Sequence, residues 1–139
     1  MKLQKLTPML YTEHLRESVE FYTTILGFQC DGMSEEAGWA SVKRDGVTIM
    51  FALPNAHIPF DQPTFTGSLY LNSDDVDEWW QQLKDKVKIC YPLENFEYGM
   101  REFAVYDNNG YLLQFGQELA ARQAGDTLDI VKENNKELK

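Results

Sequence analysis

The chain has 139 residues, of which 43% are hydrophobic and 13% aromatic, so it is long enough to bury the core of one ordinary domain. Its 22 acidic and 13 basic residues give a formal net charge of −9. Such a charge repels nucleic-acid phosphates and anionic lipid, and it favours neutral or cationic small molecules. We therefore expect no nucleic-acid and no membrane partner.

The first residues lack the apolar run of a signal peptide, and no stretch of about 18 consecutive apolar residues occurs. The sequence thus predicts a cytoplasmic protein. Cys30 and Cys90 stand far apart and without other cysteines or histidines at zinc-ligand spacing. We interpret both as reduced packing residues.

The first half of the chain alternates strand and helix patterns. Leu15, Val19, Tyr22 and Leu26 form one apolar stripe at helical spacing, and Gly27 is typical of a helix C-terminus. The elements predicted here are a strand at 5–12, a helix at 14–26, and strands at 28–34, 39–44 and 47–53. The last two strands form a hairpin.

Three prolines mark residues 54–65 as a linker, since proline removes a donor from a strand ladder. Beyond it, Val76, Trp80, Leu83 and Val87 repeat the spacing of the first helical stripe. The elements predicted after the linker are a strand at 67–72, a helix at 75–87 and strands at 88–94, 100–106 and 111–117. Ser73 or Asp74 is expected to cap the second helix.

The two halves therefore share one plan, strand–helix–strand–strand–strand. Their closing strands, 46–52 and 110–116, match in length, in alternation and in a leading glycine. We predict an α+β fold of two βαβββ modules, at 5–53 and 66–117, that form an incomplete barrel around a shared cleft. The folded domain is expected to span 1–117, and 118–139 to form a polar C-terminal helix or tail.

Alternation along four strands separates a helix-packing face from a second, partly polar face. The apolar faces are Leu6, Pro8 and Leu10; Val47, Ile49, Phe51 and Leu53; Leu69 and Leu71; and Tyr111, Leu113 and Phe115. The opposite faces are Thr7, Met9 and Tyr11; Thr48, Met50 and Ala52; Ser68, Tyr70 and Asn72; and Leu112, Gln114 and Gly116. Their mixed character suits a ligand pocket, and it suits packing against another subunit or the tail equally.

With the segments Phe21-Tyr22-x-x-x-Leu26-Gly27-Phe28 and Arg101-Glu-Phe-Ala-Val-Tyr-Asp107-x-x-Gly110 inside this plan, the chain resembles the vicinal oxygen chelate superfamily from about residue 5 to 117. That superfamily includes glyoxalase I, extradiol dioxygenases and bleomycin resistance proteins. The stretches 39–48 and 98–105 look most like the antibiotic-sequestering bleomycin resistance branch.

The resemblance implies a metal position on the first and last strand of each module, and these positions fall on Thr7, Met50, Ser68 and Gln114. Divalent ions prefer imidazole and carboxylate ligands, whereas this set offers two hydroxyls, a thioether and an amide. The expectation is therefore no metal, no cofactor and no catalytic residue. The chain would bind a small molecule rather than convert it.

By the same resemblance, a homodimer would hold a flat, aromatic or cationic ligand of the bleomycin type between Trp39 and Tyr98. Glu94, Glu97 and Glu102 would supply a negative field beside Tyr98. The residues predicted to bind ligand are Thr7, Met9, Trp39, Met50, Ser68, Tyr70, Tyr98, Glu102 and Gln114. Trp39 could equally fill the core, because the sequence does not settle which face of its strand it occupies.

Two other classes stay open. One is an enzyme, either a lyase, isomerase or dioxygenase that holds a metal with non-standard ligands, or a metal-free catalyst that uses Glu97, Glu102 or His14. The other is a protein-interaction module without a small ligand.

Overall fold

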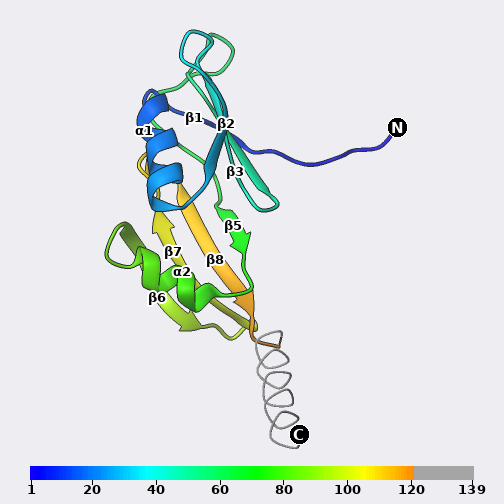
Figure 1. The fold of residues 1–139 in the computed structure, drawn as a ribbon, viewed down its shortest axis with the longest axis vertical. Coiled ribbons are helices and arrows are strands. Elements are labelled where there is room, and N and C mark those ends of the chain that lie inside the picture. Colours follow the sequence, from blue (N-terminus) through cyan, green and yellow to red (C-terminus); the bar gives the residue numbers. More distant parts are fainter. Residues whose placement is uncertain (121–139) are drawn as a thin grey trace, which may run out of the picture. The chain divides into compact units, whose positions relative to one another are not determined.

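The structure is a computed structural model that describes residues 1–120. The first half contains β1 (Met9–Tyr11), α1 (Leu15–Glu20), the π-helical turn η1 (Phe21–Ile25), β2 (Gln29–Ser34), β3 (Trp39–Arg44) and β4 (Val47–Ala52). The second contains β5 (Leu69–Asn72), α2 (Val76–Leu83), β6 (Lys88–Asn95), β7 (Met100–Tyr106) and β8 (Leu112–Glu118). The predicted α+β class and the repeated βαβββ plan are confirmed (Figure 1). The predicted tail at 118–139 lies, from residue 121 on, outside the described residues.

The chain divides into two compact units, each built on one sheet. The first unit contains residues 1–67 with 106–111, and the second contains 68–105 and the chain from 112 onward. Their sheets have the strand orders β1-β4-β3-β2 and β5-β8-β7-β6, and neither sheet closes on itself. In both, the first strand pairs in parallel with the last, as β1 does with β4 and β5 with β8. That the two modules line a shared cleft stays a prediction.

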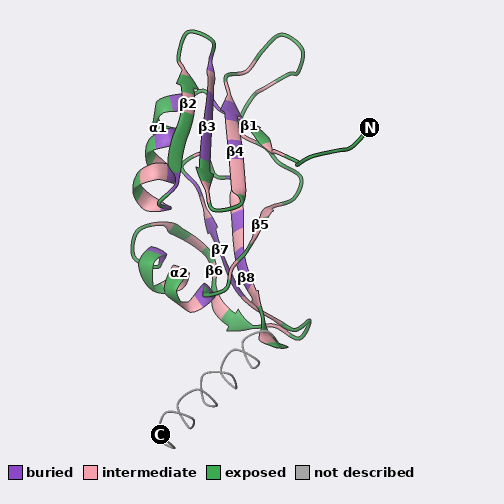
Figure 2. Ribbon diagram, turned by 45° about the vertical axis from the view of Figure 1, so that its right-hand side comes forward, coloured by how far each residue is buried: buried purple, intermediate pink, exposed green. Residues whose placement is uncertain are grey.

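In the first unit, α1 contacts one face of the sheet through β3 and β4 (Figures 1 and 2). The strand residues on this face are almost fully buried: Leu10, Ala40, Val42, Ile49 and Phe51. The predicted helix-packing parity of the strand at 47–53 is confirmed by Ile49 and Phe51. It is wrong at its end, because Leu53 lies beyond β4 and is 38% exposed.

The first helix departs from its predicted course at Phe21. Ordinary α-helix ends at Glu20, and the next turn closes a longer loop in which the Leu26 amide donates to the Phe21 carbonyl at 3.3 Å. Gly27 then ends the helix with φ +72°, as predicted. The wider turn carries the fully buried Tyr22, whose hydroxyl donates to Asp107 at 2.8 Å within the same unit.

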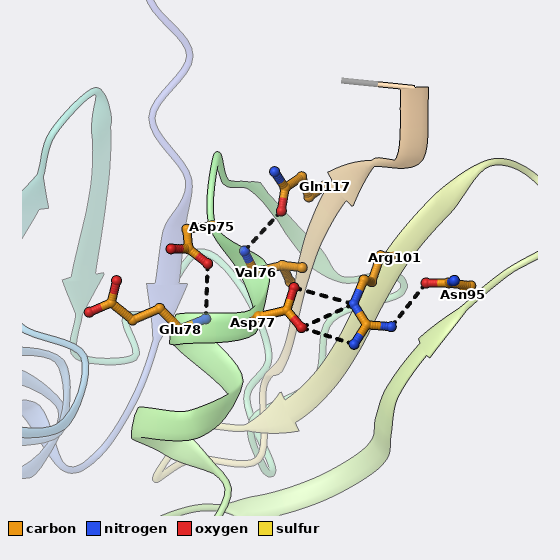
Figure 3. Close-up of polar contacts among 7 residues, drawn as sticks. All are labelled: Asp75, Val76, Asp77, Glu78, Asn95, Arg101 and Gln117. Carbon is orange, nitrogen blue, oxygen red and sulfur yellow. Dashed lines mark hydrogen bonds and ion pairs between the residues drawn. The ribbon is translucent and has the colours of Figure 1, made fainter. Parts of the chain in front are cut away.

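In the second unit, α2 packs on the sheet through two tryptophans. The Trp79 ring lies 4.9 Å from that of Phe115, and the Trp80 ring lies 5.2 Å from that of Phe103. Arg101 ties β7 to the same helix through an ion pair with Asp77 at 2.9 Å (Figure 3). The odd-numbered residues of β7 and β8 therefore face α2, which leaves their even-numbered residues on the opposite face.

The predicted cap and end of this helix are wrong by a few residues. Asp75, rather than Ser73 or Asp74, is the N-cap, because its carboxylate accepts from the Glu78 amide at 3.1 Å (Figure 3). The Ser73 hydroxyl instead accepts from the Asp75 amide in the preceding turn. The helix ends at Leu83 rather than at 87.

Several strand limits also differ from the prediction. β1 covers Met9–Tyr11 rather than 5–12, since Leu6 is 90% exposed and Pro8 has no amide to donate. β5 begins at Leu69 rather than at 67. Cys30 and Cys90 are exposed, so their predicted role in packing is wrong. No helix within residues 1–120 is long and apolar enough to cross a membrane.

Candidate functional site

The face of the second sheet that points away from α2 carries a buried carboxylate surrounded by hydroxyl groups. Glu102 is only 1% exposed. One of its oxygens, Oε1, accepts from the hydroxyls of Tyr70, at 3.4 Å, and Tyr98. The other, Oε2, accepts from the Tyr91 hydroxyl at 2.6 Å and from the Gln114 amide at 3.2 Å. We call these five residues the Glu102 cluster.

The sheet order explains why these side chains meet. Tyr70 lies on β5, Gln114 on β8, Glu102 on β7 and Tyr91 on β6, so each of the four neighbouring strands contributes one residue. Tyr70 is directly paired with Gln114 in the β5–β8 ladder. The Tyr70 side chain then crosses Gly116, where an added Cβ would lie 2.1 Å from its hydroxyl. Glycine at this position leaves the space that Tyr70 needs to reach Glu102.

A chain of hydrogen bonds leads from Ser68 through Gln114 and Tyr91 to Glu102, and each side chain donates to the next. The Ser68 hydroxyl donates to the side-chain oxygen of Gln114, which orients the Gln114 amide nitrogen toward Tyr91, at 2.7 Å, and Glu102. Tyr91 accepts that bond and donates its own proton to Glu102. All four donors to Glu102 are uncharged, so the carboxylate is held by dipoles.

The carboxylate changes the acidity of the tyrosines around it. The hydrogen bond to Glu102 raises the pKa of Tyr98 to about 12. Burial raises the pKa of Tyr70 above its ordinary value, and the negative charge of Glu102 adds to that effect. Burial likewise raises the pKa of Tyr91. The phenols therefore stay protonated donors at neutral pH.

Aromatic rings extend the cluster toward solvent. The Phe96 ring stacks on that of Tyr98, with centroids 5.4 Å apart and an angle of 15°, and it meets Tyr91 edge-on. Tyr98 is 65% exposed although its hydroxyl reaches the buried carboxylate. A polar, negatively charged centre thus lies beneath an accessible aromatic surface.

In the first unit, the face away from α1 carries a second aromatic group. Trp39 pairs with Ala52, and Met9 pairs with Met50, so these residues share one side of the sheet. The Trp39 indole nitrogen donates to the sulfur of Met50 at 3.4 Å. Trp39 is half-buried and does not fill the core beneath α1, which settles the face that the sequence left open.

The structure brings most of the predicted ligand-binding residues into two groups, one in each unit. Ser68, Tyr70, Tyr98, Glu102 and Gln114 gather in the second unit, and Trp39, Met50 and Met9 share a face in the first. Thr7 precedes β1 and belongs to no strand.

Sequence reasoning missed Tyr91 and Phe96. The signal for Tyr91 was alternation, because Ile89, Tyr91 and Leu93 are the more buried residues of β6. Their parity places Tyr91 on the face that holds Glu102.

The four positions at which the resemblance implies a metal do not fit one. Ser68 and Gln114 bind each other, and the Met50 sulfur accepts from Trp39. None of the four offers the imidazole or carboxylate that a divalent ion prefers. Within residues 1–120, no three or more His, Cys, Asp or Glu side chains are grouped so as to hold a metal ion.

Comparison with known proteins agrees with this architecture. Residues 5–115 match the sequence profile of the Glyoxalase/Bleomycin resistance protein/Dioxygenase superfamily. The chain belongs to this superfamily. No protein of curated function matches the sequence significantly.

Solved structures share the fold at low sequence identity. A superfamily member from Sphaerobacter thermophilus DSM 20745 superimposes with a TM-score of 0.73 and 19% identity, covering 84% of this chain and 98% of its own. TioX from Micromonospora sp. ML1 gives 0.67 and 20% identity, covering 84% and 99%. Lactoylglutathione lyase from Agrobacterium tumefaciens gives 0.63 and 17% identity, covering 82% and 92%. At such identities, these likenesses establish the fold alone.

Proposed function

We propose that the chain is a metal-independent binding protein that holds a small aromatic or cationic molecule without converting it. The observation that carries this proposal is the Glu102 cluster, a buried carboxylate with uncharged donors beneath an accessible tyrosine. A positively charged ligand would provide the counter-charge that these donors do not. Ser68 and Gln114, two of the four positions where the resemblance expects metal ligands, bind each other.

The aromatic side chains support a flat ligand. Tyr98 presents its ring to solvent and has Phe96 stacked beside it, and Trp39 is half-buried on the face of the first sheet that points away from α1. A ligand ring or cation on one such side chain gains about 0.5–1.5 kcal/mol beyond the burial of its area. The net charge of −9 would favour the approach of cations. Bleomycin-type antibiotics combine these features, and we propose sequestration of such a compound.

A thermal-shift panel tests the function. Bleomycin and smaller cationic aromatic compounds form one arm, and zinc, nickel, manganese and iron salts form the other. A ligand at 100 times its Kd stabilises the native state by about 2.7 kcal/mol, so a saturable rise in Tm is expected from the organic cations in the presence of EDTA. A stoichiometric metal that survives dialysis would contradict the proposal and favour the enzyme alternative.

The panel also separates the third class. A protein-interaction module would show no rise in Tm with any organic compound, because no small ligand would bind its native state. The remaining parts of the proposal are a homodimeric state and a cytoplasmic location. Localisation of the tagged chain in cell fractions checks the latter.

A further inference from the structure

The two oxygens of Glu102 differ in how exposed their hydrogen-bond donors are. Oε2 lies between the Tyr91 hydroxyl, at 2.6 Å, and the Gln114 amide, and both of these side chains are half-buried. Oε1 receives its bonds from the two tyrosines that are exposed, Tyr70 at 37% and Tyr98 at 65%. The Tyr70 bond is long, at 3.4 Å, so Tyr98 is the principal partner of Oε1.

A ligand in solution can reach Tyr98, because this side chain is 65% exposed. It lies in the turn between β6 and β7, where the Gly99 amide donates to the Phe96 carbonyl at 3.0 Å and Gly99 has φ +86°. Its ring is exposed and stacks on only one neighbour in this turn, Phe96. A rotation of the side chain would free Oε1 while the backbone of the turn stays in place.

We propose, building on the proposed function, that Oε1 of Glu102 binds a protonated amine of the ligand and that Tyr98 is a lid whose hydroxyl the ligand's N–H group displaces. The exchange replaces a neutral donor by a charged one, which makes a stronger bond to the carboxylate. It also compensates a buried charge that is otherwise met only by dipoles. Oε2 keeps Tyr91 and Gln114, so the carboxylate stays fixed during the exchange.

Three probes of one shape test the required chemistry. 2-Naphthylmethylamine is charged and has N–H donors, its trimethylammonium analogue is charged without donors, and 2-naphthylmethanol is neutral. Titrations followed by amide NMR shifts give a Kd for each. The primary amine is expected to bind about tenfold more tightly than the alcohol and more tightly than the trimethylammonium compound, because only the amine can donate a charge-assisted hydrogen bond.

Variants of two glutamates locate the charge that is responsible. Glu102→Gln should abolish the preference for the amine over the alcohol. Glu78→Gln removes the same formal charge from an exposed side chain of α2, on the opposite face of the sheet, so it should keep that preference. Melting curves of both variants establish that they are folded before binding is compared.

A substitution of Tyr98 tests whether its hydroxyl is displaced. We expect the variant to fold, because Tyr98 is largely exposed. Tyr98→Phe keeps the ring but removes the competing hydroxyl. It should therefore bind the amine more tightly than the wild type, by roughly fivefold, as expected for one lost hydrogen bond. Weaker binding of the amine would show that the hydroxyl is a ligand contact, which overturns the lid.

The outcomes distinguish a failure of the ammonium site from a failure of the proposed binding function. If the amine and the alcohol bind equally well, or Glu102→Gln leaves their ratio unchanged, the ammonium site is wrong while aromatic binding stands. If no probe gives a saturable shift up to millimolar concentrations, both proposals fail.

Discussion

At the scale of single residues, Glu102 is a buried carboxylate on one strand that accepts hydrogen bonds from side chains of the three other strands of its sheet. Ser68, Tyr70 and Gln114 could be predicted on one face because side chains alternate along strands. The central position of Glu102 could not, since it depends on which strands are neighbours and on a glycine at 116 that leaves room for Tyr70. Alternation groups Tyr91 with Ile89 and Leu93, but its contact with Glu102 also depends on β6 lying next to β7.

The acidity of Tyr98 provides a first prediction. Because its hydrogen bond to Glu102 raises the pKa to about 12, Glu102→Gln should lower that pKa toward its ordinary value near 10. Tyrosine labelled with ¹³C at Cζ, assigned with Tyr98→Phe, allows the titration to be followed by NMR. Glu97→Gln is the control and should leave most of the shift in place.

The sign of the accompanying stability change follows from linkage. A tyrosine with a raised pKa in the folded state contributes stability that is complete below about pH 10 and is lost as the pH rises through about 12. The wild type should therefore lose more stability than Glu102→Gln over that range. A Tyr98 that titrates at its ordinary value in the wild type would refute the assignment.

Asp107 carries the second prediction. This residue is 6% exposed, and its carboxylate accepts from the Tyr22 hydroxyl at 2.8 Å. Burial raises the pKa of Asp107 and the bond from Tyr22 opposes that rise, so Tyr22→Phe should raise the pKa further. We expect a loss of about 1–3 kcal/mol of stability at pH 7.5, because the buried charge loses a donor.

The expected pH dependence of this loss has a definite sign. With a raised folded-state pKa, the contribution of Asp107 is fully present below pH 3.8 and is lost as the pH rises through the folded value. The penalty of Tyr22→Phe in urea unfolding should therefore be smaller at pH 4 than at pH 7.5. Tyr111→Phe is the control, because that hydroxyl donates to a backbone carbonyl, that of Tyr11, and its loss should cost the same at both values. Equal penalties for Tyr22→Phe at the two values would contradict the argument.

At the scale of elements, periodicity predicted which helices and strands exist, and local hydrogen bonds decided where they end. The apolar stripe from Leu15 to Leu26 does not distinguish an α-helix from one that closes with a π-helical turn, because both keep the same residues inward. The π-helical turn holds Tyr22 in a position where its hydroxyl donates to Asp107, a residue 85 positions away in the sequence, and such a distant contact could not be predicted from local periodicity. The limits of β1 depended similarly on pairing with β4.

The cap of α2 gives a prediction at this scale. Asp75→Ala removes the carboxylate that accepts from the Glu78 amide, and it should cost about 1 kcal/mol of stability. Asp74→Ala makes the same change in charge one residue before the N-cap and should cost markedly less. Urea unfolding of the two variants decides between these positions. A larger loss of stability in Asp74→Ala than in Asp75→Ala would show that Asp74 is the N-cap, as the sequence suggested.

At the scale of the whole molecule, composition and charge bear on the class of ligand but not on the position of its site. A net charge of −9 favours cations wherever they bind, whereas the ammonium site that we propose depends on one buried glutamate. The duplicated plan predicted two modules of four strands each, and the strands of each module form one sheet. Alternation alone does not predict what binds to the sheet faces that point away from the helices. A ligand and a second subunit both suit mixed, partly apolar surfaces.

The last prediction therefore concerns assembly. Met9 is 44% exposed and lies on the face of the first sheet away from α1, together with Met50 and Trp39. If this face forms part of a homodimer, light scattering after size-exclusion chromatography should give twice the 16.1 kDa of one chain. Met9→Glu places a charge on that face and should shift the mass toward the monomer. Ile58→Glu introduces the same charge at a similarly exposed residue of the linker, outside both sheets, and should leave the dimer intact. A wild type that stays at the mass of one chain up to millimolar concentration would exclude the dimer and leave this face for the ligand.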